Sequence, residues 1–195
     1  MIDLRPILGA PALALALASC GGLAGYPDRS AVESAQNAWC DSLAKSSGAP
    51  GTWEHLAACK AATPSASAPY LRGMTKCFAA RKASYGDKAP DTGHIVAECN
   101  DEVTIKMDID DKLFQEAIDG RCERAARCEK VPMPECVAAV KKLESSQRAM
   151  FYGMYNGAAL HTLSDCLKSS ACGADEDAGR ALCYKPIEAK LLWFP

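Results

Sequence analysis

The sequence lacks the short motifs that identify several common classes of enzyme. It contains no Cys-x-x-Cys pair, which disulfide oxidoreductases use, and no Cys-x-x-Cys-His motif for attaching haem. It also contains no Gly-x-Ser-x-Gly nucleophile elbow and no glycine-rich phosphate loop. The tetrapeptide Ser42-Leu-Ala-Lys45 stands without the companion motifs of Ser-x-x-Lys acyl-transfer enzymes. We therefore expect a protein that is not an enzyme.

A basic excess and long apolar runs are missing as well. The formal net charge is -2, whereas proteins that bind phosphate backbones carry clustered positive charge, so nucleic acid is not an expected partner. The longest apolar stretch runs from Ile7 to Leu17. A transmembrane helix needs about 20 apolar residues, so this stretch cannot span a bilayer, and no other stretch is a candidate.

Ligands for a metal are also scarce. The three histidines, His55, His94 and His161, lie too far apart in the sequence to meet on one helix. A calcium loop starting at Asp108 would need glycine at the position of Leu113. We expect no cofactor and no metal, and we interpret the acidic run as a charged linker between repeats with a helix cap: Asp101, Glu102, Asp108, Asp110 and Asp111.

Cysteine, in contrast, is abundant, and one of the eleven cysteines differs from the rest. Cys20 closes the run Leu17-Ala18-Ser19-Cys20, which resembles a bacterial lipoprotein signal. The resemblance implies that residues 1–19 are a signal peptide, that Cys20 carries fatty acyl chains such as palmitate, and that residues 20–30 form a flexible tether. The protein would then be exported and anchored by lipid at the outer membrane or cell surface. An ordinary secretory signal, leaving Cys20 unpaired, is the alternative.

The ten remaining cysteines predict disulfide bonds in an oxidising compartment. They lie in two copies of one unit, and residues other than cysteine fix the register. The first block matches Val32, Ala35 and Cys40 with Phe114, Ala117 and Cys122, and the second matches Leu71, Met74 and Cys77 with Leu160, Leu163 and Cys166. Cys59 then corresponds to Cys136, and Cys99 to Cys183. We infer an internal duplication, with repeats at residues 31–105 and 106–195.

Apolar spacing of three and four residues predicts helices throughout, and no segment has the pattern of a strand. In the second repeat one helix carries Phe114 to Cys128, a second starts at Pro134 and runs to about Met154, and a third carries Leu160 to Ser170. A short last element covers about 177–184. In the first repeat Thr52 caps a helix through Ala62, Ser67 caps the next, and residues 84–94 form a surface loop. The predicted fold is all-α, with two tandem disulfide-stapled three-helix units and little or no β-structure.

This topology also predicts a disulfide pairing. Cys128 and Cys172 have no counterpart in the first repeat, so we expect them to bond to each other. Short connections make the first and third helices parallel, which leads to the remaining scheme. The predicted pairs are Cys128 with Cys172, Cys122 with Cys166, Cys136 with Cys183, Cys40 with Cys77, and Cys59 with Cys99.

The chain resembles the cysteine-rich predicted lipoproteins of myxobacteria in three segments. These are the lipobox, which is the run Leu17-Ala18-Ser19-Cys20, and the segments Cys122-Glu-Arg-Ala-Ala-Arg-Cys128 and Cys166-Leu-Lys-Ser-Ser-Ala-Cys172. That resemblance implies an address and a fold but no activity. Our first hypothesis is a non-catalytic envelope protein whose rigid helical surface binds another protein or a glycan. The second is a lipid or small-molecule carrier with a groove lined by Met150, Phe151, Met154 and Tyr155. The third is a hydrolase with a dispersed site involving Asp110, Asp111 or His161.

Overall fold

The all-α prediction is confirmed. The computed structural model describes residues 28–46, 53–88, 90–107, 111–148, 152–173 and 176–188, and these segments consist mainly of helices. The one β-type contact among them is an isolated antiparallel bridge between Ala66 and Tyr155. Residues 1–27 lie outside the described part, and with them the predicted signal peptide and Cys20.

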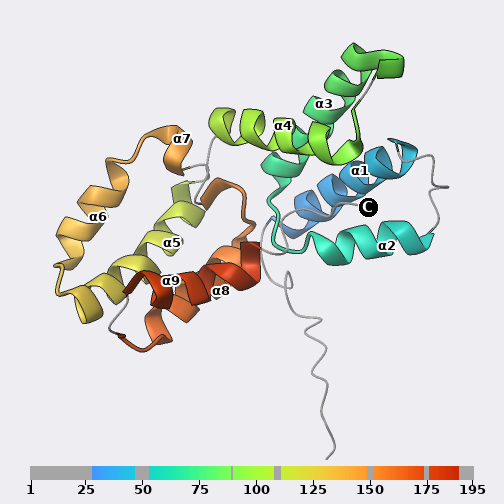
Figure 1. The fold of residues 1–195 in the computed structure, drawn as a ribbon. Coiled ribbons are helices and arrows are strands. Elements are labelled where there is room, and N and C mark those ends of the chain that lie inside the picture. Colours follow the sequence, from blue (N-terminus) through green and yellow to red (C-terminus); the bar gives the residue numbers. More distant parts are fainter. Residues whose placement is uncertain are drawn as a thin grey trace, which may run out of the picture.

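The first repeat consists of two helical hairpins (Figure 1). The first hairpin pairs α1 with α2, and the second pairs α3 with α4 after a single 3-10 turn, η1. The bounds are α1 Arg29–Ser46, α2 Trp53–Ala62, α3 Ala68–Tyr85, η1 Gly86–Lys88 and α4 Thr92–Lys106. The first helix therefore starts inside the tether predicted at residues 20–30.

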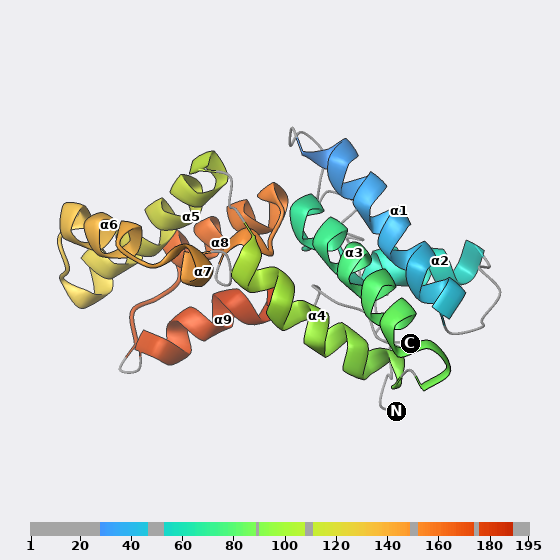
Figure 2. The same ribbon diagram turned by 90° about the horizontal axis from the view of Figure 1, so that it is seen from above.

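The second repeat has the same order of hairpins with one short helix inserted. Helix α5 continues into a π-helical segment, η2, and α7 lies between the two hairpins formed by α5 with α6 and α8 with α9. The bounds are α5 Asp111–Arg124, η2 Ala125–Glu129, α6 Met133–Lys141, α7 Ser145–Arg148, α8 Gly157–Ser169 and α9 Glu176–Glu188. Figure 2 shows the repeats side by side, with α4 of the first reaching α7 of the second.

Four expectations need correction. Each repeat contains four main helices rather than three, because α4 and α9 are full helices. The long helix predicted from Pro134 to Met154 ends at Lys141 and is followed by the short helix α7. Gln147, the one polar residue on the apolar face of the predicted long helix, lies in α7. The surface loop predicted at 84–94 is shorter, and Asp101 and Glu102 lie inside α4 rather than in a linker.

Local signals account for several helix starts. Ser67 is the N-cap of α3, as predicted, and its hydroxyl accepts a hydrogen bond from the backbone N–H of Tyr70. Asn156 caps α8 in the same way through Ala159, and Asp91 caps α4 through His94. Helix α2 spans the residues predicted after Thr52.

The core of each repeat lies between its first and third main helices. In the first repeat Trp39 of α1 meets Phe78 of α3 edge to face, with ring centroids 5.8 Å apart. In the second, α5 and α8 approach so closely at Gly120 that a Cβ there would lie 2.5 Å from Cα of Ser164. The buried residues of both repeats form one continuous cluster, so the two repeats share a core.

The repeats are joined by a symmetric hydrogen-bonded latch, formed by residues 64–67 and 153–156. The backbone N–H of Ser67 donates to Met154 O at 2.8 Å, and the N–H of Asn156 donates to Ser65 O at 2.9 Å. The side chains repeat this exchange, because Ser67 Oγ donates to Gly153 O and Asn156 Nδ2 donates to Pro64 O, both at 2.7 Å.

Ser67 and Asn156 occupy equivalent positions in the two copies, four residues before Leu71 and Leu160. Each of these four bonds is therefore matched by the bond obtained when the repeats are exchanged. Such reciprocity is typical of a two-fold interface. The latch gives the predicted internal duplication a local two-fold axis between Ala66 and Tyr155.

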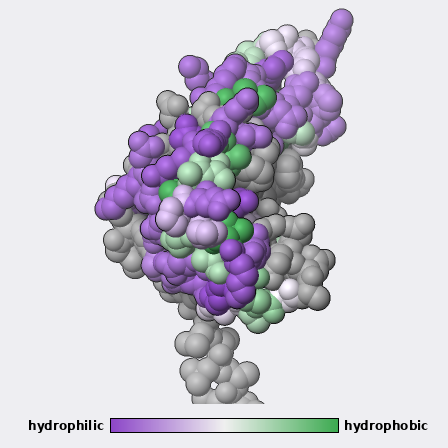
Figure 3. Space-filling model, turned by 90° about the vertical axis from the view of Figure 1, so that its left-hand side faces the viewer, coloured by the Kyte–Doolittle hydropathy of each residue, from purple (hydrophilic) through white to green (hydrophobic). Residues whose placement is uncertain are grey.

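The surface offers no membrane-crossing element within the described segments, since none of their helices is both long and apolar enough to cross a bilayer. Figure 3 shows the side of the molecule that lies on the left of Figure 1, where α6 is found. Hydrophilic residues predominate on this face, and the apolar ones form a broken band rather than one large patch. This face therefore lacks the extended apolar area that marks many docking surfaces.

Candidate functional site

All ten cysteines of the two repeats form disulfide bonds. The pairs are Cys40–Cys59, Cys77–Cys99, Cys122–Cys136, Cys128–Cys172 and Cys166–Cys183. The predicted bond between Cys128 and Cys172 is present. The other predicted bonds are wrong, namely Cys122 with Cys166, Cys136 with Cys183, Cys40 with Cys77, and Cys59 with Cys99.

The error has a geometric cause. Helices α5 and α8 are parallel, as predicted, but residues six apart on a helix point about 120° away from each other at 3.6 residues per turn. Cys122 and Cys128 therefore do not both face α8. In a helical hairpin, residues at similar distances from the turn lie side by side, and Cys122 faces Cys136 across the connection from α5 to α6.

The same rule explains the other bonds within hairpins. Cys40–Cys59 staples α1 to α2, Cys77–Cys99 staples α3 to α4, and Cys166–Cys183 staples α8 to α9. Each repeat thus carries the same two staples at positions that match in the duplication. In the chain-entropy model, loops of 14 to 22 residues correspond to roughly 3 kcal/mol of stabilisation each. These staples fix the shape of each hairpin independently of the small core.

Cys128–Cys172 is the only disulfide of the described chain that joins two hairpins, and arginines reinforce it. Arg127 donates to Leu167 O and Ser170 O, and it also contacts Lys168 O. The buried guanidinium of Arg124 donates to Ala171 O at 3.1 Å. These bonds satisfy carbonyl groups at the end of α8 that have no partner within the helix. The end of η2 and the end of α8 are therefore held together covalently and electrostatically.

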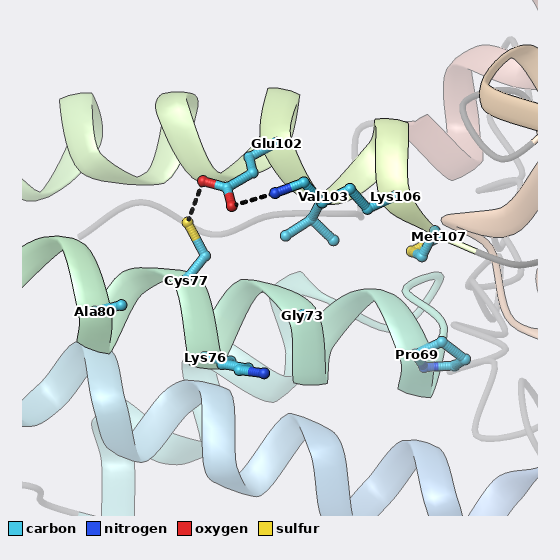
Figure 4. Close-up of a pocket in the computed structure, with 9 residues that line it drawn as sticks. All are labelled: Pro69, Gly73, Lys76, Cys77, Ala80, Glu102, Val103, Lys106 and Met107. Atoms are coloured by element: carbon cyan, nitrogen blue, oxygen red, sulfur yellow. Dashed lines mark hydrogen bonds and ion pairs between the residues drawn. The ribbon is translucent and has the colours of Figure 1, made fainter.

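An open groove of about 600 Å³ lies between α3 and α4 (Figure 4). Its floor forms where the helices approach closely, since a Cβ on Gly73 would lie 2.6 Å from Cγ1 of Val103. Pro69 and Met107 lie at one end and Ala80 toward the other. Cys77 also lines the groove, so the staple Cys77–Cys99 holds its two walls at a fixed spacing.

Charged groups occupy the rim of this groove. Glu102 accepts hydrogen bonds from Lys106 Nζ at 2.8 Å and from Arg81 at 3.0 Å, which lower the pKa of its carboxyl group. Cys77 Sγ lies 3.8 Å from Glu102 Oε2, but a disulfide sulfur has no proton to donate, so this contact is not a hydrogen bond. The Glu102 carboxylate is thus already neutralised by its neighbours.

Lys76 stands apart from this ion-pair network. It is exposed at the groove and has no hydrogen-bond or ion-pair partner within the described residues. Helix α3 carries four basic residues and no acidic one, although the chain as a whole is acidic: Arg72, Lys76, Arg81 and Lys82. Lys82 caps the end of α1 through Ser46 O. The groove therefore combines an apolar floor with a basic helix.

A smaller cavity of about 230 Å³ adjoins the latch between the repeats. It shares Pro69 with the groove and is lined also by Tyr155, the one member of the predicted carrier group that borders it. Met154, the residue before Tyr155 in the sequence, is half-buried. Met150 and Phe151 lie outside the described residues. Of the four residues of the predicted carrier groove, Tyr155 therefore lines this cavity, and the groove between α3 and α4 is a separate space lined by other residues.

His94 and His161 each contact carboxylate groups. His161 lies between Glu116 of α5 and Asp165 of α8, and His94 lies 3.4 Å from Glu98. Among the residues that the structure describes, no cluster of three or more His, Cys, Asp or Glu side chains is placed to hold a metal ion. Asp110, named for the dispersed hydrolase site, lies outside the described residues.

The groove was missed at the level of sequence. Lys76 and Val103 lie in separate helices, and α4 itself was not predicted. A usable signal existed in the uneven charge of residues 68–85, which contain four basic residues and no acidic one. Gly73 inside a helical pattern was the second signal, because a glycine there costs about 1 kcal/mol relative to alanine and so suggests close packing.

No protein-family model matches the chain, and neither a curated protein nor a solved structure matches it.

Proposed function

We propose that this protein is a lipid-anchored envelope protein that acts by binding, and that the groove between α3 and α4 is its binding surface. The five disulfides are typical of exported proteins and accord with an oxidising compartment. The lipobox ending at Cys20 supports the anchor. Export and anchoring would place the stapled helical body at the membrane surface.

One observation carries the binding role. The groove has an apolar floor, and its two walls are joined by the Cys77–Cys99 disulfide. A surface that is already rigid loses little conformational entropy when a partner binds. The partner in this proposal is an envelope protein or a glycan.

A second candidate function is that of a lipid or small-molecule carrier. The volume of the groove, about 600 Å³, supports it, because small-molecule sites commonly measure about 300–1,000 Å³. The carrier would use this groove rather than the group around Met154.

Two measurements test the proposal. Intact mass spectrometry of the exported chain should show an acylated Cys20 as the first residue, and Cys20→Ser should abolish the acyl mass. A photo-crosslinking residue at position 76 should give a defined adduct in intact cells, whereas the same residue at position 141 on α6 should not. A mature chain without acyl mass would refute the anchor. Equal crosslinking from both positions would refute the groove as the binding surface.

A further inference from the structure

The groove between α3 and α4 divides into an apolar part and a cationic edge. Val103 and Met107 are largely buried and turn toward α3, where Gly73 leaves room for them (Figure 4). Pro69 and Ala80 add apolar surface on α3. An occupant that covered this strip would exclude water from it, which favours binding by about 25 cal/mol for each Å² of apolar surface removed from water.

The charged residues that line the groove indicate which head group an apolar ligand would carry. Glu102, the one acidic residue among those that line the groove, is paired with both Lys106 and Arg81. Lys76 remains as one uncompensated positive charge among the charged groups that line the groove. The complementary ligand is therefore apolar along its body and carries a single negative charge at one end.

We infer that the groove binds a long-chain fatty acid, with the carboxylate at Lys76 and the acyl chain along Val103 and Met107. This inference rests on the second candidate function, that of a carrier, because it assigns a ligand to the same groove. A fatty acid supplies one carboxylate and one apolar chain, which match the single lysine and the single apolar strip of the groove. A lysine ammonium pairs with such a head group as a point charge and requires no fixed fork geometry.

The test uses the full exported chain carrying Cys20→Ser, so that no attached lipid competes. Isothermal titration calorimetry with palmitate below its micelle concentration should show one site per chain. Lys76→Glu should weaken binding about tenfold, equivalent to about 1.4 kcal/mol, because repulsion replaces attraction. Lys141→Glu, the same charge reversal on an exposed lysine of α6, should leave the affinity unchanged.

Two further comparisons separate the head group from the chain. Palmityl alcohol, which lacks the charge, should bind more weakly than palmitate and should not respond to Lys76→Glu. Pro69→Trp, at the end of the groove where Met107 lies, should weaken both ligands by filling the space for the acyl chain, and far-ultraviolet circular dichroism checks that the variant keeps its helices.

Three outcomes would overturn the inference. The first is no binding of palmitate, and the second is equal binding by Lys76→Glu and the parent chain. The third is that the chain does not bind palmitate but sediments with anionic phospholipid vesicles, and that Lys76→Glu abolishes this sedimentation. None of these outcomes changes the expected acylation of Cys20 or the expected crosslinking from position 76. Those two measurements therefore test the proposed function separately.

Discussion

Replacing Asn156 with alanine measures how much the latch between the repeats contributes to stability. The side chain of Asn156 is fully buried and makes three hydrogen bonds. It accepts from the N–H of Ala159 as the N-cap of α8, and it donates to Pro64 O at 2.7 Å and to Ala66 O at 3.2 Å. Loss of an N-cap costs about 1 kcal/mol, and each of the two carbonyl groups left without a donor adds about 1 kcal/mol. We expect a total near 3 kcal/mol.

Two matched variants divide this cost among its sources. Ser67→Ala removes the equivalent N-cap and a single latch bond, to Gly153 O, and should cost about 2 kcal/mol. Asp91→Ala removes an exposed N-cap of α4 outside the latch and should cost about 1 kcal/mol. Asn156→Asp keeps the oxygen that caps α8 but has no amide donor, so it should lose the latch bonds alone and gain repulsion from two carbonyl oxygens.

Urea unfolding of the Cys20→Ser chain, followed by far-ultraviolet circular dichroism, measures these differences. In thermal unfolding of a domain of this size, a decrease of about 3 kcal/mol in the free energy of unfolding corresponds to a decrease of about 6–12 °C in Tm. The expected order of destabilisation is Asn156→Ala, then Ser67→Ala, then Asp91→Ala. Equal effects of Asn156→Ala and Asp91→Ala would refute the latch as a source of stability, as would a fully stable Asn156→Asp.

Three further predictions concern packing, redox chemistry and pH. Gly120→Ala should destabilise the protein by more than 1 kcal/mol, despite the better helix propensity of alanine, because its Cβ would meet the backbone of Ser164. Gly93→Ala is the control in the same unfolding assay, because at this half-buried position the Cβ would meet only the side chain of Asp91. Under graded reduction, alkylation and mass spectrometry should show Cys128–Cys172 opening first, because neither of its cysteines is buried whereas every other disulfide has at least one buried cysteine; earlier opening of another pair would contradict this. Burial raises the pKa of Tyr70 above its ordinary value of about 10, so the contribution of Tyr70 to stability should be constant below about pH 10 and fall as pH rises further, since the unfolded chain then loses the proton more readily. Tyr70→Phe should reduce this slope in a series of Tm measurements against pH, and an unchanged slope would contradict the assignment.

Much of the local structure could be predicted from the sequence. Ser67 was identified as a helix cap because its hydroxyl competes for backbone N–H groups, and the structure places it at the start of α3. The repeat alignment paired Leu71 with Leu160, and both are fully buried at equivalent positions. Such features depend on residues close together in the chain, so local chemistry determines them.

The helix content of one segment was harder to predict. Residues 92–106 carry Asp101 and Glu102, which suggested a solvated linker, yet they form α4. Their helix is stabilised by contacts that sequence spacing does not show, such as Arg81 with Glu102 and Val103 against Gly73. Tertiary packing overrode a polar composition here.

The sequence by itself determined that the chain is helical and rich in disulfides. It also predicted a duplication, and it identified Cys128 and Cys172 as partners because neither has a counterpart in the first predicted repeat. Only the tertiary structure decided the other four disulfides, because the direction in which a cysteine points depends on helix phase and hairpin pairing. It also decided the groove, since Lys76 and Val103 meet only after α3 and α4 fold against each other. Local propensity depends on neighbours in the chain, whereas a binding surface depends on neighbours in space.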